Sequence, residues 1–149
     1  MNGIKIVKAC QEHIDDIVII ENLSFKIPWS RQSITEEIIL NNGAIYICAA
    51  LGSKTIGYAG MWHILDEGHI TNIAVHPEYR SNGVGSALME ALLLTAKALD
   101  IKALTLEVKR SNQNAQSLYK KYDFKEEGFR KAYYADTNED ALIMWKHLE

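Results

Sequence analysis

The segment Arg80-Ser81-Asn82-Gly83-Val84-Gly85 has the residue types and the spacing that can bind a phosphate group. It follows an apolar run over residues 70–75 and precedes a helical pattern that begins at Val84. The N-terminus of a helix has unpaired backbone N–H groups that attract anions, and glycine lets an anion approach the backbone closely. The segment has neither the G-K-[ST] of a Walker motif nor the spacing of a dinucleotide fingerprint. It is therefore a candidate anion site, with an ordinary strand-to-helix connection as the alternative.

A carboxylate interrupts the apolar run over residues 103–108. Glu107 shares one face of the predicted strand with Thr105, because side chains alternate along a strand. An ionised carboxylate in an interior strand costs free energy unless it is paired or used in a reaction. Such a group can take a proton from an amine, directly or through a water molecule. The structural alternative is an ion pair with Lys109 or Arg110 at the strand end.

The elements that must position these residues follow from the hydrophobic periodicity. Ser33 and Glu36 have the spacing of a capping box at the start of a helix, and Ser111 or Asn112 is a candidate cap for a later one. The predicted strands cover residues 1–8, 44–51, 55–64, 70–75, 103–108, 124–133 and 141–146. The predicted helices cover about 13–22, 33–41, 84–100 and 112–122.

The order of these elements predicts a single α/β domain over residues 1–149, with a mixed seven-stranded sheet and about four flanking helices. Turns at 52–54 and 66–68 predict that the second, third and fourth strands form an antiparallel meander. The helix from Val84 then connects the fourth and fifth strands as a parallel crossover. Its core-facing residues are predicted to be Val84, Leu88, Leu92, Thr95 and Leu99.

The composition excludes several classes of protein. The chain of 149 residues is 48% hydrophobic and 23% charged, which is typical of a globular domain, and its net charge of −3 argues against nucleic-acid binding through bulk attraction. The N-terminus lacks the apolar core of a signal peptide, and the longest apolar tract is too short to span a membrane. Cys10 and Cys48 are predicted to be buried thiols in a reducing compartment, so a cytoplasmic location is expected. The histidines at 63, 69, 76 and 147 share no metal-ligand spacing, and no metal is predicted.

The glycine-rich loop, the helix opened by Asn112 and the strand begun by Phe124 together resemble the GNAT superfamily of acyl-CoA-dependent N-acetyltransferases. The resemblance covers essentially the whole chain. Within the superfamily the sequence is most similar to the bacterial ribosomal-protein-alanine N-acetyltransferases, which acetylate the N-terminal alanine of ribosomal protein bS18. The stretches that carry this similarity are Pro28-Trp29-Ser30, Asn72-Ile73-Ala74-Val75, Leu106-Glu107-Val108, Ser111-Asn112, Leu118-Tyr119, Tyr133-Tyr134 and Glu139-Asp140-Ala141-Leu142-Ile143-Met144.

The resemblance implies roles for particular residues. It makes Glu107 the general base for the attacking amine and Tyr119 the general acid for the coenzyme A thiolate, with a core tyrosine as the structural alternative for Tyr119. It implies a sheet that is splayed between the fourth and fifth strands. Acetyl-CoA, the implied co-substrate, is expected to contact Ile73, Ala74, Val75, Arg80, Ser81, Asn82, Gly83, Val84, Gly85, Ser86 and Asn112.

The implied partner is a protein N-terminus, with no direct nucleic-acid or membrane partner. Trp29, Asn72, Tyr133 and Tyr134 are the candidate substrate-binding residues, and packing before a helix cap is the alternative for Trp29. Two other functions remain open at this point. One is acetylation of another N-terminus, a lysine or a small amine, and the other is a non-catalytic acyl-CoA-binding module.

Two positions depart from the pattern of the superfamily. Ser81 stands where many members have a second basic residue, so the anion is expected to rely more on the backbone N–H groups and Arg80. The affinity for acetyl-CoA is the property that this departure affects. Asp123 stands where relatives usually have glycine before the phenylalanine. Aspartate can adopt the left-handed conformation at a helix end at some cost, so reduced stability is expected there rather than lost function.

Overall fold

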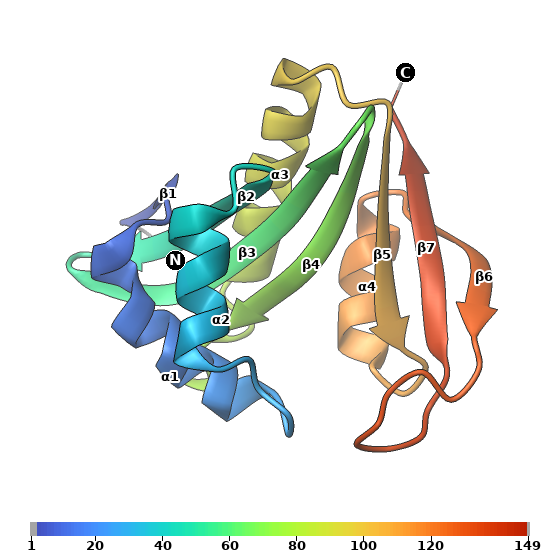
Figure 1. Ribbon diagram of the computed structural model, residues 1–149, viewed down its shortest axis with the longest axis horizontal. Helices are drawn as coiled ribbons and strands as arrows, with labels where there is room; N and C mark the ends of the chain where they lie inside the picture. Colours follow the sequence, from blue (N-terminus) through green and yellow to red (C-terminus); the bar gives the residue numbers. More distant parts are fainter. Residues whose placement is uncertain (1–2, 149) are drawn as a thin grey trace.

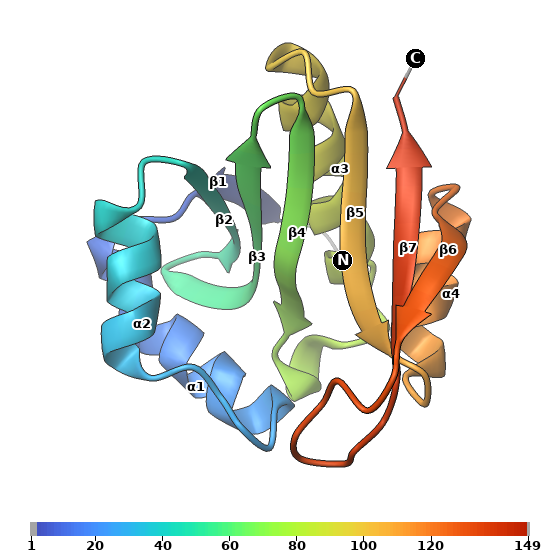
Figure 2. The same cartoon turned by 45° about the vertical axis from the view of Figure 1, so that its right-hand side comes forward.

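The computed structural model describes residues 3–148, which form one seven-stranded sheet in the order β1-β2-β3-β4-β5-β7-β6 (Figures 1 and 2). The predicted mixed sheet with four helices is confirmed. The strands are β1 (Ile4–Lys8), β2 (Ala44–Leu51), β3 (Lys54–Ile64), β4 (Glu67–Val75), β5 (Ala103–Lys109), β6 (Lys125–Arg130) and β7 (Ala141–His147). The α-helices are α1 (Ile14–Ser24), α2 (Arg31–Thr35), α3 (Val84–Ala98) and α4 (Gln113–Lys121), and shorter helical turns are η1 (Gln11–His13), η2 (Glu36–Leu40) and η3 (Pro77–Tyr79).

The sheet consists of two antiparallel groups that meet at one parallel junction. β1 to β4 are antiparallel neighbours, and β7 lies between β5 and β6 with antiparallel pairing on both sides. β4 and β5 are parallel and pair only over Glu67–His69 with Ala103–Thr105. Figure 1 shows the two strands diverging beyond this short region, which agrees with the predicted splay.

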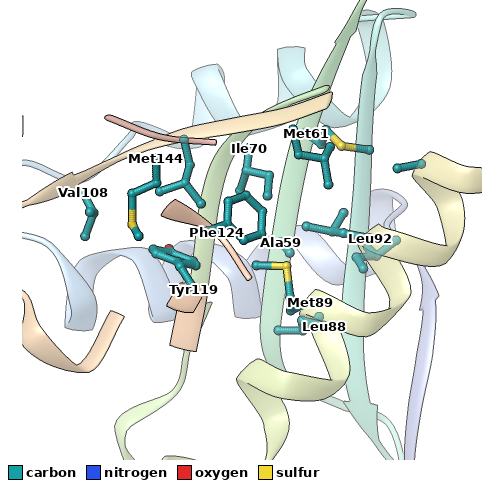
Figure 3. Packing of buried hydrophobic residues seen from close by; sticks show 14 of the residues in the cluster. Ala59, Met61, Ile70, Leu88, Met89, Leu92, Val108, Tyr119, Phe124 and Met144 are labelled. Atoms are coloured by element: carbon teal, nitrogen blue, oxygen red, sulfur yellow. The ribbon is translucent and has the colours of Figure 1, made fainter. Parts of the chain in front are cut away.

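Helices cover both faces of the sheet. α1 and α2 lie on one face and α3 on the other (Figure 1). The alternation of β2 explains this, because Tyr46 and Cys48 pack toward α1 and α2 whereas Ile47 and Ala49 belong to the α3 side. Figure 3 shows the larger cluster, in which side chains of α3 meet the sheet and Tyr119 of α4.

Three predicted element boundaries are wrong. α2 begins after Ser30, which has an extended backbone and whose side-chain hydroxyl accepts a hydrogen bond from the Ser33 N–H at 3.1 Å. Ser33 therefore lies inside the helix, and the Ser33–Glu36 capping box does not form. The predicted 66–68 turn is shorter, because β4 begins at Glu67 and includes Gly68. Glycine is needed at this position for packing, since an added Cβ would lie 2.5 Å from Leu104 Cδ2. The strand predicted over 124–133 ends at Arg130, since β7 begins opposite that residue and offers no partner beyond it.

Two predictions about burial also need correction. Leu99 was assigned to the core face of α3, but it follows the last helical residue and is 43% exposed, while Met89 and Ala96 complete the buried face. Thr95 is only partly buried there and donates its hydroxyl to the Ala91 carbonyl. Cys10 is exposed, contrary to prediction, because it caps η1. Cys48 is buried, as predicted, and burial raises its thiol pKa to about 12.

The departure at Asp123 has the expected conformation. Asp123 follows α4 with a φ of 69°, so aspartate occupies the left-handed position that glycine favours. Its N–H donates a hydrogen bond to the Lys120 carbonyl at 3.0 Å, and the next residue, Phe124, is 2% exposed. The turn therefore delivers a large aromatic side chain into the core.

Within residues 3–148, no helix has the length and apolar character needed to cross a membrane.

Candidate active site

An irregularity in β4 opens the sheet where the predicted site residues lie. Gly60 of β3 pairs with Asn72 and Met61 pairs with Ile70, so Thr71 is an extra residue in β4. A bulge of this kind bends a strand and disrupts its ladder. The pairing with β5 has already ended at His69, and the next residues of β4 diverge from β5. The bend leaves room between Ile73 on one strand and Glu107 on the other for two connected clefts.

The first cleft, which we call the loop cleft, has a volume of about 540 Å³ and lies between β4, the glycine-rich loop and α4. It brings together ten of the eleven residues predicted to contact the co-substrate. These are Ile73, Ala74, Val75, Arg80, Ser81, Gly83, Val84, Gly85, Ser86 and Asn112. Residues from three separate stretches of sequence therefore line one continuous space.

The glycine-rich loop has a geometry that suits an anion. Gly83 has a φ of +81° and precedes α3, and nothing lies within 4 Å of the position that a Cβ would occupy there. The first N–H of α3 with a helical partner is that of Ala87, which donates to the Gly83 carbonyl at 3.0 Å. The N–H groups of Val84, Gly85 and Ser86 therefore have no partner within the helix and lie at the wall of the loop cleft. This arrangement fits a pyrophosphate group.

The side chains of Arg80 and Asn82 form hydrogen bonds within the loop and to its neighbours. The Arg80 side chain donates to the Val75 carbonyl at 3.0 Å and to the Ser24 hydroxyl at 3.3 Å, which ties the loop to β4 and to the end of α1. Asn82 turns its amide back onto the carbonyls of Tyr79 and Arg80 and does not line either cleft. A contact of Asn82 with the co-substrate stays a prediction.

The second cleft, which we call the sheet cleft, has a volume of about 630 Å³ and lies between β4, β5 and two loops. It is lined by Glu107 and by all four predicted substrate-binding residues, Trp29, Asn72, Tyr133 and Tyr134. The residues shared by the two clefts are Ser24, Phe25, Ile73, Asn112, Ala115 and Tyr119. The two clefts therefore adjoin at a wall that includes Tyr119.

Glu107 lies at the sheet cleft without a close cation. Its side chain is 31% exposed, and the contact with Arg130 is 3.8 Å long and involves an exposed guanidinium. An exposed pair of that geometry contributes little. Lys109 and Arg110, the alternative partners, pair with Asp136 and Asp140 instead. The carboxylate is therefore available to accept a proton.

Tyr119 is held at the junction of the clefts by its position on α4. Asn112 caps this helix by accepting the Ala115 N–H at 3.1 Å, which fixes the turn that precedes Tyr119. The tyrosine is 8% exposed and its ring packs on Phe124, with the ring centroids 6.0 Å apart. Burial raises the pKa of Tyr119 to about 12. The phenol is therefore a proton donor at any physiological pH.

The loop between β6 and β7 carries Tyr133 and Tyr134 over the sheet cleft. The two rings meet edge to face with centroids 5.2 Å apart. The hydrogen-bonding interaction with the Glu107 carboxylate, followed by burial, raises the pKa of Tyr133. Lys109 pairs with Asp136 at 2.6 Å and lies over the Tyr134 ring, which anchors the loop to the end of β5.

Sequence reasoning missed a buried carboxylate at the sheet cleft. Glu21 is 1% exposed and lies on the inner face of α1, where it accepts the Trp29 N–H at 3.0 Å and the Tyr58 hydroxyl. The signal was present, because Glu21 follows Ile14 and Ile17 at the spacing of the apolar stripe of α1. Ser24 and Phe25, which line both clefts, had no such signal.

Known proteins resemble this chain in sequence and structure. Residues 14–124 match the model of the Acetyltransferase (GNAT) family. The chain is 42% identical over 134 residues, or 90% of its length and 89% of the relative's, to a Bacillus subtilis protein with the provisional name [ribosomal protein bS18]-alanine N-acetyltransferase. It is 36% identical over 129 residues, or 84% of each chain, to the Escherichia coli K12 [ribosomal protein bS18]-alanine N-acetyltransferase. The crystal structure of an Escherichia coli ribosomal-protein-S18-alanine N-acetyltransferase has a TM-score of 0.90 and 29% identity, covering 98% of this chain and 94% of that one.

Proposed function

Because the chain belongs to the GNAT acetyltransferase family, whose co-substrate is acetyl-CoA, we propose that it acetylates the N-terminal alanine of ribosomal protein bS18. The observation that carries this proposal is that Glu107 and Tyr119 both line the sheet cleft and that Tyr119 also lines the loop cleft. The relatives' names support the choice of substrate, since bacterial proteins similar to this chain along most of its length are named for that reaction. The proposed location is the cytoplasm.

In this proposal the loop cleft holds acetyl-CoA, which supplies an activated acetyl group as a thioester. The pyrophosphate is bound by the N–H groups at the start of α3, with Arg80 and Ser81 at its side. The pantetheine arm extends along the free edge of β4 as an added strand would, and Asn112 contacts it. The backbone N–H groups of residues 73–75 then polarise the thioester carbonyl.

The chain's own groups move two protons. Glu107 takes a proton from the protonated α-amino group, directly or through water, so that the neutral nitrogen can form a bond to the carbonyl carbon as the carbon–sulfur bond breaks; the nitrogen then loses its second proton to water. An α-amino group has a pKa of about 7.7 to 8.0 and is substantially protonated near neutral pH, which is why a base is needed. Tyr119 donates its proton to the departing sulfur and regains one from solvent. The products are the N-acetylated peptide and free coenzyme A.

The sheet cleft receives the N-terminus of the substrate protein. Tyr133 and Tyr134 form one wall and Trp29 forms the opposite side, while Asn72 lies on β4 between them. Aromatic side chains provide a large contact area at low entropic cost. The proposed partner is a protein N-terminus, with no direct role for nucleic acid or membrane.

The proposal is tested by measuring thiol release from acetyl-CoA with three peptides of the bS18 N-terminal sequence. One has a free alanine N-terminus, one is blocked at the N-terminus and keeps a free lysine, and one begins with a bulky residue. We expect release with the first peptide alone. Release with the blocked peptide would indicate a lysine acetyltransferase, release with none of them would favour a small amine, and the absence of any acetyl-CoA binding would contradict the family function altogether.

A further inference from the structure

A hydrogen-bonded chain of three side chains connects the interior of the protein to the sheet cleft. It begins at Glu21 of α1, whose Oε1 accepts the backbone N–H of Trp29 at 3.0 Å. The other carboxylate oxygen, Oε2, accepts the hydroxyl of Tyr58 from β3. Glu21 is 1% exposed and Tyr58 is 2% exposed, so this carboxylate has exchanged water for two protein donors. Burial raises the pKa of Glu21.

The chain ends at an atom with no partner. Asn72 of β4 donates Nδ2 to the Tyr58 hydroxyl oxygen at 3.4 Å. Its Oδ1 is the one buried side-chain nitrogen or oxygen in residues 3–148 that has no hydrogen-bond partner. Native structures leave few buried polar atoms unpaired, and each one calls for an explanation. Asn72 lines the sheet cleft together with Glu107 and Tyr119, so the unpartnered oxygen belongs to a residue of this cleft, although the oxygen itself has almost no exposed surface.

The direction of every bond in the chain follows from Glu21. In its ionised form Glu21 only accepts hydrogen bonds, so the single proton of the Tyr58 hydroxyl is directed at Glu21, in agreement with the Tyr58 hydroxyl to Oε2 hydrogen bond. The Tyr58 oxygen can then only accept from Asn72, and therefore the NH₂ of the Asn72 amide must face Tyr58. The carbonyl oxygen is left as the end that remains free. The buried charge thus decides which end of the Asn72 amide is left without a hydrogen-bond partner.

We infer that Glu21 and Tyr58 are positioning residues that orient Asn72 Oδ1 as an acceptor for the N–H groups of the substrate's first residue. The inference rests on the proposed function, because it needs an amine or amide donor in the sheet cleft. Asn72 and Glu107 are then two acceptors in one cleft, provided by β4 and β5. Together they select a positively charged or neutral amine over a blocked terminus, which has fewer N–H groups to donate.

An isosteric substitution can reverse the chain without changing its shape. In Glu21→Gln, the amide oxygen is required by the Trp29 N–H, so the new NH₂ group faces Tyr58 and donates to it. The Tyr58 proton is then directed at Asn72, whose Oδ1 turns inward to accept it and whose NH₂ group turns toward the substrate. The Asn72 NH₂ group and the N–H groups of the substrate are then both donors, so no hydrogen bond forms between them. We expect the KM for an alanine-initiated peptide to rise about tenfold or more, as for the loss of a hydrogen bond to a charged group, with the KM for acetyl-CoA unchanged.

The decisive test is a double variant. Asn72→Asp alone places a second carboxylate against a Tyr58 oxygen whose proton is committed to Glu21, so it should also raise the peptide KM. In Glu21→Gln/Asn72→Asp, the Tyr58 proton is accepted by Asp, and its second oxygen is again an acceptor at the sheet cleft. We therefore expect the double variant to recover at least part of the lost peptide affinity. Glu126→Gln, an exposed carboxylate of β6 outside both clefts, is the control.

The outcomes separate the inference from its premise. If the wild-type protein does not acetylate the peptide at its N-terminus, the proposed function fails and the inference fails with it. If the wild type is active and Glu21→Gln leaves the peptide KM unchanged, the inference alone is overturned. A purely electrostatic role predicts that Asn72→Asp lowers the peptide KM, and a purely structural role predicts that the two defects add. Thermal unfolding and the KM for acetyl-CoA verify that each variant is folded, and recovery in the double variant supports the inference.

Discussion

Replacement of Tyr119 by phenylalanine removes one oxygen from a buried ring and leaves its packing on Phe124 in place. The tyrosine pKa of about 12, against an ordinary value of 10.0, means that burial disfavours the phenolate by about 3 kcal/mol. The phenol therefore serves only as an acid. Full transfer of its proton to a thiolate whose conjugate acid has a pKa of about 8.5 is uphill by about 5 kcal/mol. The rate contribution of the acid is therefore expected at the lower end of the usual range of about a hundredfold to ten-thousandfold. We expect kcat to fall about a hundredfold in Tyr119→Phe, with little change in the KM for acetyl-CoA.

The pH dependence provides an independent test of the same assignment. At pH 9.5 a tyrosine with the ordinary pKa is about one quarter ionised, whereas one with a pKa of about 12 is less than about 1% ionised. Wild-type kcat should therefore not decline between pH 8 and pH 9.5 through loss of the Tyr119 proton. Thiol release is measured across this range for the wild type, for Tyr119→Phe and for Tyr122→Phe, a control at the residue that follows α4, whose hydroxyl donates to Glu90. Undiminished kcat in Tyr119→Phe would refute the acid role.

Three further predictions follow from the geometry. Glu107→Gln should lower kcat chiefly at the lower end of the pH range, where the amine most needs a base, and steady-state rates that match those of Glu126→Gln would contradict this. Gly60→Ala should lower the free energy of unfolding by about 1 to 3 kcal/mol, because the added Cβ would lie 2.2 Å from the Tyr46 ring, and denaturant unfolding measures the change. Lys109→Met should raise the peptide KM roughly threefold to tenfold by releasing the loop that carries the tyrosine pair, without changing the KM for acetyl-CoA; an unchanged peptide KM would show that the loop is positioned without this anchor.

The sequence predicted the succession of helices and strands, and the loop at the N-terminus of α3, because local signals agree there. Alternating apolar residues, glycine-bearing turns and a change to helical periodicity all indicate the same succession of elements. Gly83 has the positive φ that the anion loop requires. Gly85, in contrast, lies in the regular first turn of α3, where an added Cβ would be 3.4 Å from Leu118, so its small size matters there and not its conformational freedom.

Features that depend on contacts between distant parts of the sequence could not be predicted from local sequence patterns. The bulge at Thr71 is a mismatch between β3 and β4, and no residue type in either strand indicates it. The role of Ser30 as a cap could not be separated from that of Ser33, because both hydroxyls precede helix-forming residues at equivalent spacing. The buried state of Glu21 depends on Tyr58, which is 37 residues away in the sequence. A polar residue on an apolar stripe was the one available signal.

The central claim is that this chain transfers an acetyl group to the α-amine of an alanine. The most direct measurement is tandem mass spectrometry of a peptide that has both an N-terminal alanine and an internal lysine, after incubation with the protein and acetyl-CoA. We expect one added acetyl group, located on the alanine nitrogen, and its loss in Glu107→Gln. An acetyl group on the lysine side chain, or an unmodified peptide when acetyl-CoA is bound, would contradict the proposed function.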